Sequence, residues 1–186
     1  MTSNDSQHPR RSIVLIGFRG SGKSVVGREL VKLTGGELID TDELIAQQAG
    51  KSIVELFDRE GERAFRRREE GAVRRAAMQS PSVISVGGGA VLSRRNVELL
   101  RSIGYLVWLT APAEVLWQRI NSDPSSDNAR PPLTNLSGVE EVQQLLTQRT
   151  PHYAGTAHLT VDTTSGTPSE MAAEIVMKLD ALTGDD

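Results

Sequence analysis

The residues with the clearest chemical meaning lie at positions 17–24, which read Gly-Phe-Arg-Gly-Ser-Gly-Lys-Ser. This stretch fits the pattern G-x-x-x-x-G-K-[ST] of a phosphate-binding loop, and it follows an apolar run and precedes a helix-patterned segment, as that loop requires. The loop backbone and the start of the helix bind phosphate, Lys23 supplies charge to the outer phosphates, and the Ser24 hydroxyl supplies a ligand for Mg²⁺. A plain glycine-rich turn is the alternative, and the flanking segments argue against it. The sequence therefore predicts a nucleotide-binding protein whose loop contacts come from Gly20, Ser21, Gly22, Lys23 and Ser24.

Two acids follow the second apolar run with one residue between them. Asp40 stands at the expected strand end, where it could reach Mg²⁺ directly or through water, and Asp42 stands one step further on. Asp42 could accept a proton from a substrate hydroxyl, since phosphoryl transfer needs a positioned nucleophile. A helix cap with a first-turn acid explains the same pair without any chemistry. Both interpretations stay open at this point.

A second glycine-rich strand end is Gly87-Gly88-Gly89, which follows Ile84-Ser85-Val86. Consecutive glycines suggest a ligand pressed against the backbone, and a bulge or tight turn is the alternative. Many phosphate-loop proteins have a magnesium-binding Asp at the end of the third strand, and this chain has no acid there. Magnesium is therefore expected to depend on Ser24, Asp40, water and the phosphates themselves.

Three arginines stand out from the surface charge. Arg130 lies in the polar stretch 121–138, where an arginine on a closing lid could clamp the transferring phosphoryl group. The alternative for this stretch is a tolerated surface insertion. Arg66 and Arg149 could hold a small carboxylate in forked hydrogen bonds. The alternatives are a solvated helix face with an Arg66–Glu69 pair, and a helix end before Pro151 where a cation suits the dipole.

The elements that must position these residues alternate along the chain. Short apolar runs predict strands at 12–16, 37–39, 82–86, 105–109 and 158–161. Helix-patterned stretches predict helices at 24–33, 41–49, 62–79, 96–102, 113–120, 139–149 and 169–182, with extra helix crowded into 51–68. In the last helix, Met171, Ile175, Leu179 and Leu182 form a stripe expected to face the core. This alternation predicts an α/β fold with a parallel sheet wrapped by helices, which places the candidate residues along one rim.

Composition limits the classes of protein to consider. The chain has 186 residues, enough for one domain with a core, and a formal net charge of −3, which does not favour nucleic acid. It contains no cysteine, and no apolar run approaches the length of a membrane span. The polar segment 1–11 is expected to be a disordered tail. We expect a cytoplasmic monomer that binds neither nucleic acid nor membrane.

Taken together, the motifs resemble the shikimate kinase family over nearly the whole chain, from about Ile13 to Leu182. The matching motifs are the phosphate loop, D-T-D at 40–42, G-E-x-x-F-R at 61–66, G-G-G-A at 87–90, R-P-x-L at 130–133 and R-x-P-x-Y at 149–153. The resemblance implies the nucleoside-monophosphate-kinase type of phosphate-loop fold, a three-layer αβα sandwich with a five-stranded parallel sheet. It also implies a single kinase domain with a substrate-binding segment at about 41–70 and a lid at about 121–138.

The resemblance further implies transfer of the γ-phosphate of ATP to the 3-hydroxyl of shikimate, with Mg²⁺, on the route to chorismate and the aromatic amino acids. Asp42, as the base, would bind shikimate with Gly88, while Arg66 and Arg149 would hold its carboxylate. Phe57 and Phe65 would wall the pocket, although core aromatics fit the same positions. Ser24 and Asp40 would serve Mg²⁺, and Lys23 and Arg130 would serve the phosphates. Arg119 would lie along the adenine, and Val25, which stands where the family usually has Thr, would contact ATP near its α-phosphate.

Two other functions remain as alternatives. A related kinase of gluconate or of a nucleoside monophosphate would share the loop but lack paired arginines aimed at one carboxylate. A catalytically silent regulatory module would not need Lys23, Asp40, Asp42 and Arg130 together. ATP consumption that depends on shikimate distinguishes the three.

Overall fold

The computed structural model describes residues 11–122 and 136–183, in which strands and helices alternate along the chain. The strands are β1 (Ser12–Ile16), β2 (Leu38–Asp40), β3 (Val83–Ser85), β4 (Gly104–Thr110) and β5 (Leu159–Asp162). The helices are α1 (Lys23–Thr34), α2 (Thr41–Ala49), α3 (Ile53–Ala77), the short 3₁₀ helix η1 (Ala90–Leu92), α4 (Arg94–Ile103), α5 (Ala113–Ser122), α6 (Gly138–Thr156) and α7 (Pro168–Thr183). Each predicted strand is present, with ends that differ by at most one residue.

The strands form one five-stranded sheet in the order β2-β3-β1-β4-β5, and every neighbouring pair is parallel. β1 lies at the centre, where Leu15 pairs with Ser85 of β3 and with Val107 of β4. The predicted parallel α/β sheet is therefore confirmed. Because all the strands run the same way, the loops that follow them meet at one rim of the sheet.

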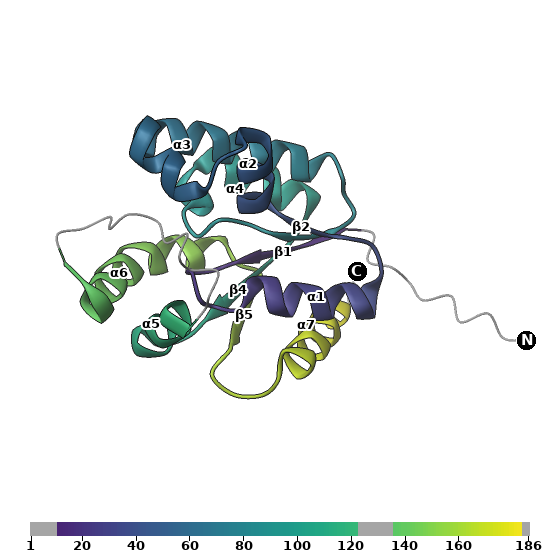
Figure 1. Cartoon of the computed structure of the whole chain (residues 1–186). Coiled ribbons are helices and arrows are strands. Elements are labelled where there is room, and N and C mark those ends of the chain that lie inside the picture. Colours follow the sequence, from purple (N-terminus) through teal and green to yellow (C-terminus); the bar gives the residue numbers. More distant parts are fainter. Residues whose placement is uncertain (1–10, 123–135, 184–186) are drawn as a thin grey trace, which may run out of the picture.

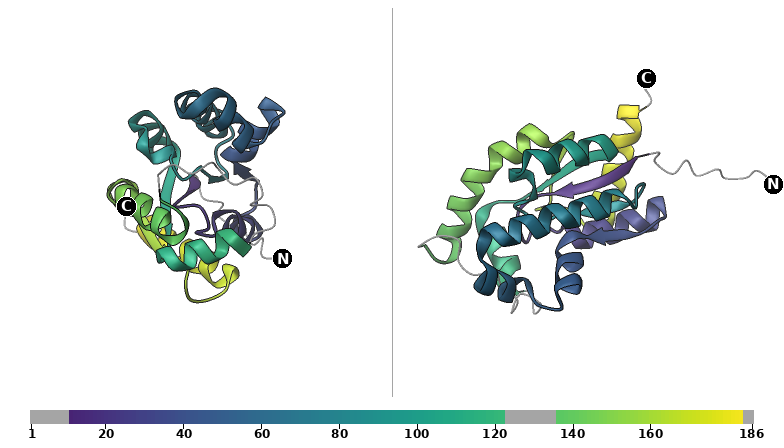
Figure 2. Two further views of the ribbon diagram at one scale, coloured as in Figure 1. Left: turned by 60° about the vertical axis from the view of Figure 1, so that its left-hand side comes forward. Right: turned by 90° about the horizontal axis from the view of Figure 1, so that it is seen from above.

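Helices cover both faces of this sheet (Figure 1). Ile13 and Leu15 of β1 pack with residues of α1 and α7 on one face. Val14 and Ile16 point to the other face and pack with residues of α3, α4 and α6. Successive side chains of a strand point to opposite faces, so a continuously apolar strand indicates burial on both sides. The two turned views in Figure 2 show the same layers, with α2, α3 and α4 gathered on one side.

The segment between β2 and β3 differs from the sequence prediction. The extra helix predicted within 51–68 is present, and it forms one helix with the stretch predicted at 62–79: α3 runs from Ile53 to Ala77. A capping box begins it: the Ser52 hydroxyl accepts a hydrogen bond from Glu55 N–H, and the Glu55 carboxylate accepts one from Ser52 N–H. The helix is kinked at Gly61, whose φ is 76° and ψ is 168°.

Two predictions for the C-terminal half are wrong: the end of the helix at 139–149 and the burial of Leu182. Helix α6 does not end before Pro151 but continues through it to Thr156. Pro151 and Thr147, one turn earlier, are both exposed, so water can bond the carbonyl that loses its helical donor. The buried residues Tyr153 and Thr156 hold the last turns in place. In α7, Leu182 does not face the core but is 51% exposed at the last turn of the helix.

Some predicted features lie wholly or partly outside the described residues. The tail at 1–11 and the lid at 121–138 lie outside the described residues except for Arg11, 121–122 and 136–138. Arg130 and the R-P-x-L motif lie outside them as well. Within residues 11–122 and 136–183, no helix combines the length and the apolar character needed to cross a membrane.

Candidate active site

A large cavity opens along the rim where the strands end, with a volume of about 1290 Å³. Its walls come from the phosphate loop (17–24), the start of α2, the loop of glycines 87–89 after β3 (the glycine loop), α5, α6 and the loop before α7. The predicted site residues that line it are Gly20, Gly22, Lys23, Ser24, Val25, Asp40, Asp42, Gly88, Arg119 and Arg149. Parallel α/β sheets place ligands in this position. The cavity is therefore the candidate active site.

The phosphate loop connects β1 to α1 at one end of this cavity. Ser21 N–H donates to Phe18 O at 3.2 Å, which closes the turn. The Lys23 ammonium donates to two loop carbonyls, Gly17 O and Phe18 O, each at 2.9 Å. The cation therefore lies over the loop at the N-terminal end of α1, where the helix dipole also favours an anion.

Asp40 joins the end of β2 to two hydroxyl groups. Its Oδ2 atom accepts hydrogen bonds from Ser24 Oγ at 3.2 Å and from Ser85 Oγ at 3.0 Å. Its Oδ1 atom accepts from Asp42 N–H at 2.9 Å and caps α2. The cap explanation and the convergence with Ser24 are thus both correct, because the two carboxylate oxygens take different partners.

The oxygen atoms of Ser24, Asp40 and Ser85 suit a hard cation that takes most of its other ligands from water and from a bound nucleotide. Magnesium prefers oxygen ligands and usually retains several waters while it binds one or two carboxylates and substrate phosphates. In the described part of the chain, no group of three or more His, Cys, Asp or Glu side chains could hold a metal alone. The residues present at Ser24 and Asp40 therefore fit Mg²⁺ carried with phosphates better than a metal held only by protein.

Asp42 stands in the first turn of α2, half-buried in the cavity wall. It lies near Asp40 in the chain, but its side chain is not part of the cap, which Asp40 provides. On the same wall, buried Thr41 accepts a hydrogen bond from Gly87 N–H at 3.1 Å. Thr41, the middle residue of the D-T-D motif, therefore links the start of α2 to the glycine loop. Asp42, the last residue of the motif, lines the cavity.

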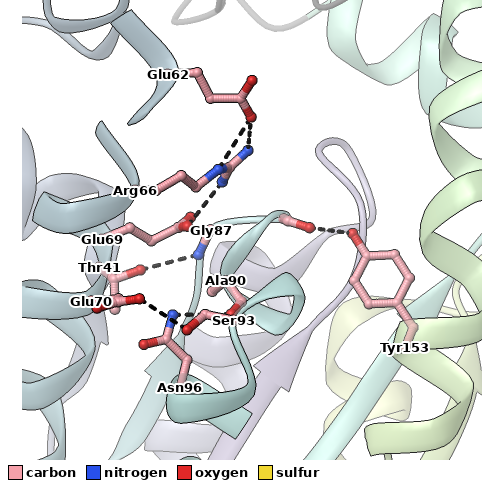
Figure 3. A network of polar contacts seen from close by, with 11 residues as sticks. Thr41, Glu62, Arg66, Glu69, Glu70, Gly87, Ala90, Ser93, Asn96 and Tyr153 are labelled. Carbon is pink, nitrogen blue, oxygen red and sulfur yellow. Dashed lines mark hydrogen bonds and ion pairs between the residues drawn. The ribbon is translucent and has the colours of Figure 1, made fainter. Parts of the chain in front are cut away.

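The glycine loop lies between α3 and α6 (Figure 3). On one side, the Tyr153 hydroxyl donates to Gly88 O at 2.6 Å. On the other side, a Cβ atom at Gly89 would lie 2.0 Å from Arg66 Nη1. The tight turn that the sequence left as an alternative is present, since Ala90 N–H bonds Gly87 O at 2.9 Å, and at Gly89 this turn also lies close against a guanidinium.

Arg66 is held by two acids from its own helix (Figure 3). Its Nη1 atom donates to Glu69 and its Nη2 atom to Glu62, each at 2.9 Å. Burial lowers the pKa of Arg66, but the carboxylates of Glu69 and Glu62 outweigh it and raise that pKa above its ordinary value. The sequence predicted the Arg66–Glu69 pair on a solvated face, whereas Glu69 is only 1% exposed. Arg66 borders Gly89 and is not among the described residues that line the cavity.

Arg149 reaches the cavity from α6 and is 7% exposed. Its guanidinium lies 5.5 Å from the centre of the Phe18 ring. A cation over an aromatic face is stabilised by the charge distribution of the ring. The helix continues past Arg149, so the side chain is explained by this packing and not by the end of a helix dipole.

Phe57 and Phe65 lie elsewhere. Their ring centres are 4.3 Å apart, and both rings are buried with Ile45, Leu56 and Ala72 beneath α2 and α3. Neither ring is among the described residues that line the cavity. The structure therefore brings them together as core aromatics, and the predicted pocket wall remains a prediction.

Arg119 of α5 connects the two loops at the other end of the cavity. It donates to Thr163 Oγ1 at 2.8 Å and to Thr163 O at 2.5 Å, with a longer contact of 3.4 Å to Gly20 O. Val25 lines the same region and is exposed. Ser21 is fully buried inside the loop, so its side chain supports the loop rather than the cavity wall.

Sequence reasoning gave no supporting role to Thr41, Ser85 or Tyr153, and it predicted Glu69 only as the partner of Arg66 on a solvated helix face. Ser85 had a readable signal, because it is the one polar residue in an apolar strand run. Thr41 and Tyr153 act through contacts that span 46 and 65 positions, which no local pattern announces. Tyr153 did belong to the motif R-x-P-x-Y, but the motif gives no partner for its hydroxyl.

The sheet order and the phosphate loop, together with the likeness to a solved shikimate kinase, define a phosphate-loop kinase of small molecules with the nucleoside-monophosphate-kinase-like fold. The family model for shikimate kinase matches residues 19–180. The chain belongs to the shikimate kinase family.

Relatives and solved structures agree with this assignment. A shikimate kinase of Symbiobacterium thermophilum is 40% identical over 168 residues, which are 90% of this chain and 95% of that protein. A shikimate kinase of Geobacter sulfurreducens is 41% identical over 165 residues, covering 89% of this chain and 88% of that protein. The structure of shikimate kinase from Acinetobacter baumannii in complex with shikimate superimposes with a TM-score of 0.86 at 33% identity, covering 94% of this chain and 95% of that chain.

Proposed function

We propose that the protein transfers the γ-phosphate of ATP to the 3-hydroxyl of shikimate, giving shikimate 3-phosphate and ADP. The observation that carries this proposal is the single cavity whose walls include Lys23, Asp42 and Arg149. A phosphate-binding cation, a candidate base and a carboxylate-binding cation are the groups this transfer requires. The reaction belongs to the route to chorismate and the aromatic amino acids.

The nucleotide end of the site is the phosphate loop. The backbone of Gly20, Ser21 and Gly22 cradles the phosphates, and Lys23 exchanges its loop carbonyls for phosphate oxygens. Ser24 and Asp40 hold Mg²⁺, whose charge, when it is bound, neutralises the phosphate oxygens of ATP. Val25 and Arg119 border the nucleotide, with Arg119 toward the adenine.

The acceptor end lies between α2 and α6. Asp42 accepts the proton of the 3-hydroxyl as that oxygen attacks the γ-phosphorus, and the bond to the ADP oxygen breaks. Arg149, which lines the cavity, and Arg66, which lies against Gly89 beside it, hold the carboxylate, and Gly88 offers backbone to the ring. Phe57 and Phe65 support the substrate-binding segment at 41–70 from the core.

Three further parts of the proposal concern Arg130, assembly and location. Arg130, on the lid at about 121–138, clamps the transferring phosphoryl group, although it lies outside the described residues. Every residue that the described site needs comes from one chain, which supports activity as a monomer. We place the reaction in the cytoplasm, where ATP is the common phosphoryl donor.

The test is release of ADP by purified protein with Mg²⁺ and ATP. We expect release to rise strongly when shikimate is added, and not when gluconate or a nucleoside monophosphate is added instead. Equal rates with all three acceptors would contradict the proposal. A rise with gluconate alone or with the nucleotide alone would identify the related kinase that the sequence left open.

A further inference from the structure

Tyr153 is a buried phenol that the proposed reaction does not use. Its side chain is completely buried, and its hydroxyl donates to Gly88 O at 2.6 Å. Its ring stacks on Trp108, with centres 5.7 Å apart and planes inclined by 24°. The contact with Trp108 fixes the orientation of the Tyr153 ring, and the hydrogen bond from its hydroxyl fixes the Gly88 carbonyl. The contact therefore joins α6 to the glycine loop at a defined point (Figure 3).

The peptide that Tyr153 holds also faces Arg66. A peptide group is planar, so a fixed Gly88 carbonyl fixes the neighbouring Gly89 nitrogen and Cα as well. The Arg66 guanidinium packs against that Cα so closely that a Cβ there would lie 2.0 Å from Nη1 and 2.8 Å from Nη2. The buried carboxylate of Glu69 holds the guanidinium from behind. One rigid peptide thus separates Tyr153 on α6 from Arg66 on α3.

Tyr153 and Arg149 occupy the same face of α6. They are four positions apart, which places side chains one above the other on a helix, and both are buried. Any shift of Tyr153 relative to the glycine loop therefore moves Arg149 relative to Arg66. Resting on the proposed function, we propose that Tyr153 is a positioning residue for the acceptor: its hydroxyl sets the spacing of the two arginines that hold the substrate carboxylate.

The chain provides a matched control, because its second tyrosine lies at the opposite end of the sheet. Tyr105 is the second residue of β4, where it pairs with Ile13 and makes an edge contact with the His158 ring at 5.8 Å. Tyr105→Phe removes the same hydroxyl group from a tyrosine of β4, which does not contact the glycine loop. Tyr153→Phe removes the hydroxyl but keeps the ring on Trp108.

The first measurement is steady-state kinetics of both variants with ATP and shikimate. We expect Tyr153→Phe to raise KM for shikimate about tenfold, with a smaller loss in kcat and an unchanged KM for ATP, because misplaced binding groups weaken the hold on one substrate only. Tyr105→Phe should match the wild type in all three constants. The proposal is overturned if Tyr153→Phe leaves KM for shikimate unchanged, or if it raises both KM values equally.

The second measurement needs no substrate, so it separates this inference from the proposed function. Amide hydrogen exchange in the loop reports its closed turns, in which Ala90 N–H bonds Gly87 O and Leu92 N–H bonds Gly89 O. We expect faster exchange at 86–92 in Tyr153→Phe and no change there in Tyr105→Phe. Unchanged exchange in both variants overturns the inference even if shikimate is the substrate. A Tyr153→Phe protein that fails to fold overturns it too, because the hydroxyl then serves overall stability. Faster exchange in a protein inactive on shikimate supports the loop contact and contradicts only the proposed function.

Discussion

At the scale of single residues, the site uses one group for two structural purposes. Asp40 accepts from the backbone of Asp42 with one oxygen and from the hydroxyls of Ser24 and Ser85 with the other. The cap begins α2 directly after β2, so the next acid in the chain is delivered to the cavity. Asp42 therefore lines the cavity while Asp40 caps the helix, as the proposed role of Asp42 as the base requires.

Asp42→Asn tests the role of this acid. An amide keeps the shape but cannot accept the proton, so we expect kcat to fall by about 10²- to 10⁴-fold. KM for ATP should barely change, because the phosphate loop is untouched. Steady-state kinetics measures both constants. The same chemical change at exposed Asp58 of α3 is the control and should leave kcat as it is. A similar loss at both positions would contradict the assignment.

Gly89→Ala tests whether the position of Arg66 matters. The added methyl group would meet the guanidinium at 2.0 Å, and a flexible side chain responds by moving away. The backbone at Gly89, with φ −101°, suits any residue, so we expect folding to survive. We expect KM for shikimate to rise about tenfold or more in kinetic assays, with KM for ATP unchanged.

The matched control for this substitution is Gly155→Ala. Position 155 is an exposed position of α6, and an added methyl group there has no neighbour within 4 Å. Its kinetic constants should equal those of the wild type. An unchanged KM for shikimate in Gly89→Ala would show that Arg66 does not bind the acceptor.

At the scale of elements, α3 carries both the kink and the guanidinium. Gly61 adopts φ 76° and ψ 168°, a conformation open almost only to glycine. Arg68 bridges the kink with two hydrogen bonds of 2.9 Å to Glu60. The kink redirects the helix five residues before Arg66, so it sets the angle at which that side chain approaches the glycine loop.

Two glycines of α3 give opposite predictions. Gly61→Ala should lower the free energy of unfolding by about 1–3 kcal/mol, because alanine is strained at this backbone conformation. Gly71→Ala should raise it by about 0.5–1 kcal/mol, since this position is helical and has open space for a methyl group. Urea unfolding measures both. Equal effects of the two substitutions would show that the kink at Gly61 is not a constraint.

Element boundaries were predictable where local signals agree. The strand at 12–16 and the helix at 41–49 match the sequence prediction without change, since an apolar run and a cap mark them. The start of α3 carried a signal too, because Ser52 and Glu55 have capping-box spacing. The continuation of α6 past Pro151 was not predictable, since tertiary packing of Tyr153 and Thr156 outweighs the local cost of proline.

At the scale of the whole molecule, the edge strand β5 pairs with β4 along its length, and the histidine that precedes β5 adds a further link between them. His158 N–H donates to Leu106 O at 2.8 Å, and His158 Nδ1 accepts from Leu106 N–H at 2.9 Å. Burial and the positive charges of Arg101 and Arg11 lower the pKa of His158 below its ordinary 6.5. A protonated Nδ1 could no longer accept this hydrogen bond.

This contact makes stability depend on pH. As the pH falls past 6.5, the unfolded chain binds a proton before the folded one does, so the free energy of unfolding falls until the lowered folded pKa is passed. We expect a loss below about 1 kcal/mol, because the ring is partly exposed. Urea unfolding at about pH 7.5 and about pH 5 measures it. His158→Gln should remove this part of the pH dependence, and the control His152→Gln in α6 should not.

The site as a whole was predictable to the extent that motifs follow strand ends. The order of strands places the phosphate loop, Asp42 and Gly88 at one rim, which the alternation of elements already implied. The depth of each side chain was not predictable. Phe57 and Phe65 lie in the core and Glu69 is buried, because packing between α2 and α3 decides burial and sequence periodicity does not.

The two tryptophans of the chain occupy informative positions. Trp117 borders the cavity, while Trp108 lies against the ring of Tyr153. The molecule therefore carries its own fluorophores, one where ligands arrive and one beside the interior contact that orders the acceptor side. Their emission provides an optical titration of either substrate without a dye, and Trp117→Phe and Trp108→Phe assign the signal to one location or the other.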